Sequence, residues 1–179
     1  KEFPTAPFIG VKPAIKLASL YTKSRKVGVL ATGVTLSGER FISLLERFAE
    51  NLMVLTQPCP GLVEKVEAGE VESAETEQLL RRCLLPLMER GVDVVVLGCT
   101  HFPFLRPLVE KIVGKGVAVV DTGAPVAKQT KKVLVQMGLT SPPKGGREWF
   151  YTSGHPERVE PVIKRLWGGV GEGLIRYAE

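Results

Sequence analysis

A short apolar run that ends in a polar turn limits what this chain can fold into. Val92–Leu97 has the length and composition of a buried β-strand, and Gly98-Cys99-Thr100-His101 follows it directly. Pro103 comes next, at a position typical of the first turn of a helix. A strand that passes through such a turn into a helix is the repeating unit of a parallel α/β sheet. The carboxyl ends of the strands are where these sheets bind ligands.

Apolar runs alternate with helical patterns along most of the chain. Strands are predicted over 8–11, 26–32, 52–56, 92–97, 117–121 and 148–152. Helices are predicted over 13–24, 37–50, 62–68, 74–90, 103–113, 122–137 and 156–167, with a loop over 141–146. The runs at 26–32 and 92–97 are apolar without alternation, which is typical of parallel strands buried on both faces. We therefore expect an α/β fold with a mostly parallel sheet, helices on both faces and right-handed crossovers.

Composition restricts the partners and the compartment. The net charge of +5 comes from scattered basic residues without interleaved aromatics, which disfavours nucleic-acid binding and suits solvated faces or an anionic small substrate. No apolar run approaches about twenty residues, so no membrane span is expected. Cys59, Cys83 and Cys99 form neither a disulfide framework nor a zinc pattern, which predicts a reducing cytoplasm and no metal. Because the chain starts without Met or a signal-peptide core, we expect a fragment or a processed product.

The turn after Leu97 holds the candidate chemistry. Cys99 suits acid/base or nucleophilic work, because backbone N–H groups and the positive end of the next helix stabilise a thiolate. The alternative is a buried structural cysteine. His101 either exchanges a proton and orients a substrate, or caps and packs. Thr100 either offers its hydroxyl and N–H to a carboxylate or caps the helix at Pro103.

Residues outside this turn carry weaker signals. Glu67 taken alone is a solvated helix residue. Thr32 and Thr35 follow the strand over 26–32, at the same sheet edge as Cys99, so they either line a pocket there or satisfy the turn. His155 is assigned no role.

The segment Gly98-Cys99-Thr100-His101-Phe102-Pro103 resembles the second cysteine motif of the glutamate racemases, which are cofactor-independent members of the aspartate/glutamate racemase superfamily. Segments 8–14, 27–32, 59–69 and 119–123 resemble other family segments in order and spacing, so the resemblance extends from residue 1 to about residue 155. It implies that two cysteines face opposite sides of the substrate α-carbon. One thiolate removes the α-proton and the other thiol returns a proton from the opposite face.

The resemblance also implies roles for single residues. Cys99 is one acid/base, Glu67 pairs with or tunes His101, His101 assists or contacts the substrate, and Thr100 binds it. The substrate is glutamate, no cofactor or metal is needed, and D-glutamate feeds cell-wall peptidoglycan and so cell shape. A second copy of the chain, in a homodimer, is a candidate partner.

The resemblance divides the chain into two parts. Residues 11–123 are expected to form a complete flavodoxin-like three-layer lobe that carries Cys99, and residues 1–10 and 124–179 part of a second similar lobe. The family's Asp-Ser and Cys-Asn-Thr segments do not occur in this sequence. We therefore expect the isolated chain to have little or no racemase activity, and to expose a sheet edge and apolar surface.

Three alternatives stay open at the level of sequence. The first is another enzyme of the superfamily, an aspartate or hydantoin racemase or a related decarboxylase. The second is a cysteine hydrolase that uses Cys99 and His101. The third is a non-catalytic binding fragment.

Overall fold

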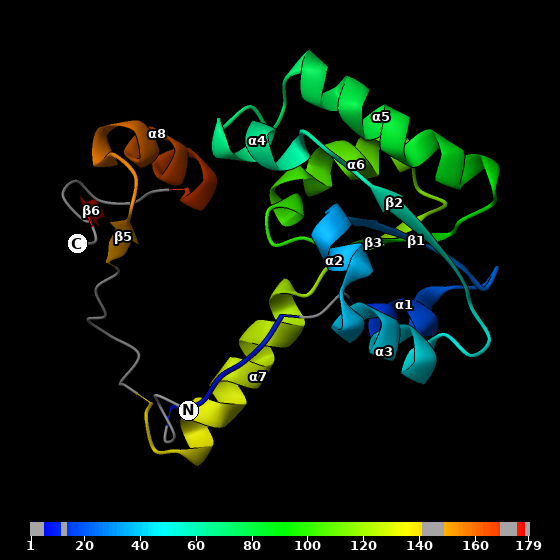
Figure 1. The fold of residues 1–179 in the computed structure, drawn as a ribbon, viewed down its shortest axis with the longest axis horizontal. Helices are drawn as coiled ribbons and strands as arrows, with labels where there is room; N and C mark the ends of the chain where they lie inside the picture. Colours follow the sequence, from blue (N-terminus) through cyan, green and yellow to red (C-terminus); the bar gives the residue numbers. More distant parts are fainter. Residues whose placement is uncertain (1–5, 12–13, 141–148, 169–174, 178–179) are drawn as a thin grey trace.

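A four-stranded parallel sheet forms the centre of the computed structural model, which describes residues 6–11, 14–140, 149–168 and 175–177. Its strands are β1 (Lys26–Ala31), β2 (Met53–Pro58), β3 (Val94–Leu97) and β4 (Ala118–Val120), in the order β2-β1-β3-β4 (Figure 1). The chain runs from β1 outward to β2 and then crosses to β3 on the other side of β1. Ligands bind such sheets at the carboxyl ends of the strands, beside the point where the strand order reverses.

Helices cover both faces of this sheet (Figure 1). One face carries α1 (Ile15–Tyr21), α2 (Gly33–Ser37) and α3 (Glu39–Phe48); the other carries α4 (Leu62–Glu67), α5 (Ala74–Glu89), the 3₁₀ helix η1 (Phe102–Leu105) and α6 (Arg106–Val113). Successive strand residues point into different cores, since Val29 packs with α1 and α3 whereas Leu30 packs with α4 and α5. The strands are therefore apolar at consecutive positions, and the fold has three layers.

Two parts of the chain lie outside this three-layer body: the helix after β4 with the segment beside it, and a small unit of two strands and a helix. The helix α7 (Gly123–Gln136) leaves the sheet after β4, and the segment 6–11 runs alongside it (Figure 1). None of the described α7 side chains is buried. The strands β5 (Phe150–Thr152) and β6 (Ile175–Tyr177) pair in parallel through α8 (Pro156–Trp167). On α8, Leu166 packs against the core beneath α4 and α5, so this small unit touches the body at the end of α4.

The predicted α/β class, with a parallel sheet and helices on both faces, is confirmed. The strand predicted over 8–11 is wrong: these residues pair with no strand in the described part of the chain, and the Phe8 side chain is 80% exposed. The helix predicted over 13–24 is shorter, since α1 spans Ile15–Tyr21. Pro13, the loop over 141–146 and Glu148 lie outside the described residues. No helix in the described ranges is long and apolar enough to cross a membrane.

Candidate active site

Cys99 lies at the carboxyl edge of the sheet because Gly98 lets β3 approach β1 closely. The Gly98 N–H donates to Leu30 O at 2.8 Å. A Cβ at position 98 would lie 2.9 Å from that same carbonyl oxygen and 3.3 Å from Ala31 Cβ, so no larger side chain fits without movement. Cys99 is therefore held next to the end of β1, beside the point where the strand order reverses.

Phe102 anchors the turn that carries Cys99 and His101. Its ring is 1% exposed and belongs to the core between the sheet and α5. Its backbone N–H donates to Cys99 O at 3.2 Å, which closes the turn. Burial of this ring fixes the backbone, while the side chains of Cys99 and His101 stay partly exposed. The turn thus presents a thiol and an imidazole to the same edge of the sheet.

Three side chains form a chain of polar contacts at this edge. Cys99 Sγ lies 3.8 Å from His101 Nδ1, and His101 Nε2 lies 2.6 Å from Glu67 Oε1. Glu67 is the last residue of α4, 34 positions before His101. A carboxylate only accepts hydrogen bonds, so His101 Nε2 carries the proton in this contact. Nδ1 of the neutral imidazole is then a hydrogen-bond acceptor that faces the Cys99 thiol.

A cavity of about 200 Å³ adjoins the thiol. It is lined by Val11, Thr35, Leu97, Gly98, Cys99, Thr100 and Thr122. Three of these residues are threonines, whose hydroxyl groups can donate and accept hydrogen bonds, and none of the described lining residues is charged. The Thr35 hydroxyl is also 2.9 Å from that of Thr32, which caps α2 by accepting the N–H of Thr35. The cavity offers hydrogen bonds to a small polar molecule placed against the sulfur.

The predicted site residues occupy two positions relative to this cavity. Cys99 and Thr100 line it directly, whereas His101 and Glu67 are not among its lining residues and reach it through the Cys99 sulfur. Thr35 lines it and Thr32 supports Thr35.

Val11 and Thr122 were missed as lining residues. Thr122 could have been predicted from the sequence, because it follows β4, the neighbour of β3, and so lies at the same edge of the sheet as Cys99. Val11 carries no comparable signal, since the segment that holds it is not a strand.

The other two cysteines are part of the core. Cys59 and Cys83 are buried between the sheet and α5, and neither lines the cavity. The Cys59 thiol donates to Gln57 O at 3.3 Å. The neighbouring Cys83 thiol, together with burial, raises the pKa of the Cys59 thiol, and Cys59 in turn lowers the pKa of Cys83. Both thiols are closed off from the cavity, so neither is placed to exchange a proton with a molecule bound there. In the described ranges no group of three or more His, Cys, Asp or Glu side chains is placed to hold a metal ion.

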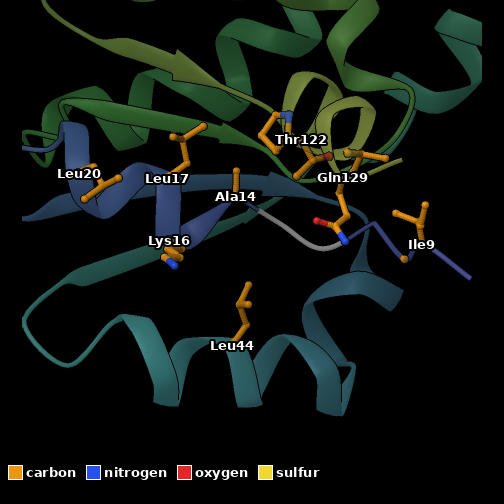
Figure 2. A pocket seen from close by; sticks show the side chains of 11 residues that line it. Ile9, Ala14, Lys16, Leu17, Leu20, Leu44, Thr122 and Gln129 are labelled. Atoms are coloured by element: carbon orange, nitrogen blue, oxygen red, sulfur yellow. The ribbon is translucent and has the colours of Figure 1, made fainter. Parts of the chain in front are cut away.

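A second cavity, of about 430 Å³, lies between α1, α3 and α7 (Figure 2). Its lining is mostly apolar and includes Leu17, Leu20 and Leu44, with Lys16 as the charged member. Thr122 belongs to this lining as well as to that of the Cys99 cavity. Thr122, just before α7, therefore lies between the cavity at the sulfur and the apolar one.

Sequence comparison places the chain in a family. The family model described as Asp/Glu/Hydantoin racemase matches residues 1–130. The chain belongs to the Asp/Glu/hydantoin racemase family. A protein of Pseudomonas paraeruginosa named glutamate racemase is 45% identical over 168 residues, which cover 94% of this chain and 63% of that relative. One of Pseudomonas putida with the same name is 46% identical over 165 residues, which cover 92% and 62%.

Solved structures of the family share the fold. A glutamate racemase isoform from Bacillus anthracis superposes with a TM-score of 0.83 at 26% identity, over 99% of this chain and 66% of that one. The Escherichia coli glutamate racemase, solved with L-glutamate and the activator UDP-MurNAc-ala, gives a TM-score of 0.76 at 30% identity, over 94% and 63%. This racemase-family chain thus spans about 63% of the length of the Pseudomonas paraeruginosa relative.

Proposed function

We propose that this chain supplies Cys99 as one of the two acid/base groups of a cofactor-independent glutamate racemase. The observation that carries the proposal is the contact series from Glu67 through His101 to Cys99, which ends at a cavity lined with hydroxyl groups. The Pseudomonas relatives named glutamate racemase support glutamate as the substrate.

The chemistry follows from the contacts. His101 Nδ1 takes the Sγ proton of Cys99, and Glu67 holds the opposite imidazole nitrogen, so the cation that forms is stabilised. The thiolate then removes the α-proton of the amino acid, and the electron pair of the C–H bond remains on a planar carbanion. On this proposal the hydroxyl and N–H groups of Thr100 and the hydroxyls of Thr35 and Thr122, three residues that line the cavity, would hold the carboxylate that delocalises this charge.

Inversion needs a proton donor on the opposite face of that carbanion. Cys59 and Cys83 are buried away from the cavity and do not qualify. We propose that the second donor belongs to the portion of the family fold that this chain does not match. Exposed apolar side chains on and after α7, including Val135, Met137 and Leu139, support an unfilled contact surface there. On this proposal the chain by itself racemises little or no glutamate.

The same proposal includes the division of the chain into parts of two lobes. Residues 11–123 would be the lobe that carries Cys99, since the whole four-stranded sheet falls within them. Residues 1–10 and 124–179 would belong to a second lobe, to which the β5-α8-β6 unit contributes. The protein would act in the cytoplasm, where free thiols persist, and D-glutamate would serve peptidoglycan synthesis.

Reconstitution tests the function. The chain is co-expressed with the part of the Pseudomonas paraeruginosa relative that the alignment leaves uncovered, and glutamate racemisation is followed by circular dichroism. We expect turnover by the combination, none by the chain alone, and loss of turnover in Cys99→Ser but not in the matched control Cys83→Ser. A combination without turnover, or one in which Cys99→Ser is as active as the parent, would overturn the proposal. The same assay with aspartate and a hydantoin tests the choice of substrate.

A cysteine hydrolase is the second candidate, because Glu67 supplies the third group that orients the histidine of such enzymes. In that case Cys99 would form a thioester with an activated acyl substrate. Mass spectrometry of the chain after incubation with p-nitrophenyl acetate distinguishes the two. An acyl adduct that forms at Cys99 and is then hydrolysed over repeated turnovers favours the hydrolase.

A further inference from the structure

Arg106 joins three elements beside the Cys99 cavity. It is the first residue of α6, and its Nη1 donates to Val119 O in β4 at 2.7 Å. The same nitrogen donates to Glu110 Oε1 at 3.0 Å, and Nη2 donates to Asp121 Oδ2. Asp121 in turn accepts the N–H of Gly123 on Oδ1 at 2.7 Å. One guanidinium thus ties α6, the end of β4 and the first residue of α7 together.

The Arg106–Asp121 pair is better protected from water than other pairs on this surface. Its side chains are 31% and 17% exposed, whereas Glu110 is 51% exposed. Burial acts to raise the pKa of Asp121, but the hydrogen bonds from Arg106 and Gly123 outweigh it and keep this pKa below its usual value. Asp121 is therefore charged at neutral pH. Arg106 is favoured over Lys here, because the planar guanidinium can reach Val119 O and the carboxylate at once.

Thr122 lies between the two residues that this network fixes. Asp121 precedes it and Gly123 follows it; the Asp121 carboxylate accepts the Gly123 N–H on one oxygen and a bond from Arg106 on the other. Thr122 forms part of the wall of the Cys99 cavity and, on its other side, of the apolar cavity in Figure 2. A shift of this residue toward the apolar cavity would therefore enlarge the cavity at Cys99.

We propose that Arg106 and Asp121 are positioning residues that hold Thr122 in place and so set the width of the cavity at Cys99. Neither residue lines that cavity, so both act through Thr122. A fixed wall keeps a small α-amino acid against the sulfur and keeps larger molecules out. The use of this wall to select a substrate rests on the proposed function, whereas the wall itself is tested without any substrate.

Thiol labelling of the chain tests the proposal with two neutral probes of different size, iodoacetamide and N-ethylmaleimide. Mass spectrometry gives the labelling rate of each cysteine, and the rate ratio of the large to the small probe reports access to Cys99. In Asp121→Ala we expect this ratio to rise at least about fivefold, the effect of losing one typical hydrogen bond. Asp121→Asn should give a smaller rise, because its amide oxygen still accepts the Gly123 N–H. Arg106→Lys should also raise it, and the matched control Glu110→Gln should not.

The buried thiols separate loosening of the wall from general unfolding. If the proposal holds, Cys59 and Cys83 stay unlabelled in every variant while Cys99 changes. The proposal is overturned if the ratio at Cys99 stays constant, if Glu110→Gln changes it as much as Asp121→Asn, or if all three thiols become reactive together. If the reconstituted racemase is inactive but the labelling ratios change as expected, the proposed function is overturned and this inference still holds.

Discussion

Glu67 Oε1 and His101 Nε2 lie 2.6 Å apart although 34 positions separate the two residues. The contact connects the end of α4 to the turn after β3, two elements on either side of α5 in the sequence. It orients the imidazole so that its other nitrogen is 3.8 Å from Cys99 Sγ. The candidate chemistry therefore depends on how α4 packs as much as on the cysteine turn itself.

Glu67→Gln is expected to slow alkylation of Cys99 by iodoacetamide at neutral pH, because the amide no longer stabilises an imidazolium beside the thiol. The Glu67 side chain is 67% exposed, so the effect should be modest, up to about fivefold, as for other exposed ion pairs. The rate is measured by mass spectrometry of the labelled peptide. Glu64→Gln in the same helix is the control and should leave the rate unchanged. Equal alkylation rates in both variants would show that Glu67 does not influence the Cys99 thiol.

Gly98→Ala is expected to destabilise the fold and to disturb Cys99. Its Cβ would lie 2.9 Å from Leu30 O, so the end of β3 must move away from β1, at a cost of about 1–3 kcal/mol in the free energy of unfolding. Urea denaturation measures the cost. Gly116→Ala is the matched control, since a Cβ there meets nothing within 4 Å. A Gly98→Ala chain as stable as the control would contradict the close approach of the two strands.

Phe102 and Phe104 give a second matched pair within one turn. Phe102 is 1% exposed and Phe104 is 41% exposed. Phe102→Ala should lower the free energy of unfolding by about 3–5 kcal/mol, the cost of truncating a buried ring, and should loosen the turn that carries Cys99. Phe104→Ala should cost much less. Thermal unfolding followed by circular dichroism compares the two, and similar losses would show that Phe102 is not the anchor.

Asp93 makes the free energy of unfolding depend on pH in the acid range. Burial pushes its pKa upward, but bonds from the Thr22 hydroxyl and from the backbone N–H groups of Ser24 and Lys23 lower it to about 2, from 3.8 in an unperturbed carboxyl. Because the folded pKa is the lower one, this stabilisation is present above the unfolded value and is lost as pH falls through about 2.

Asp93→Asn should therefore cost about 1 kcal/mol near neutral pH, allowing for solvent screening of this accessible group. It should also flatten the decline of stability between pH 3.8 and about 2. Urea denaturation at a series of pH values measures both effects. Exposed Glu89→Gln is the control for the loss of a carboxylate. An unchanged acid profile in Asp93→Asn would show that the carboxylate is not held as described.

Sequence reasoning was most accurate where the local pattern and the fold agree. The run at 26–32 lies within a sheet covered on both faces, so positions 27–31 are buried and lack polar side chains, and β1 spans Lys26–Ala31. The helix predicted over 156–167 is also confirmed as α8. Residues 8–11 have the composition of a strand but find no partner in the described ranges, because a strand requires a neighbour that its own sequence does not specify. The 3₁₀ turn at Phe102–Leu105 was expected as the start of a helix, and α6 begins only at Arg106.

By itself the sequence determined the order of the four strands of the central sheet, most of the helices, and the position of Cys99 and Thr100 at a strand end. These features are encoded locally, in runs of apolar residues and in the glycine and proline that bound them. Only the tertiary structure decided that Glu67 Oε1 lies 2.6 Å from His101 Nε2 and that Thr122 lines the cavity at Cys99. Such contacts join segments tens of residues apart. They depend on how helices pack across a sheet, and no local pattern specifies that packing.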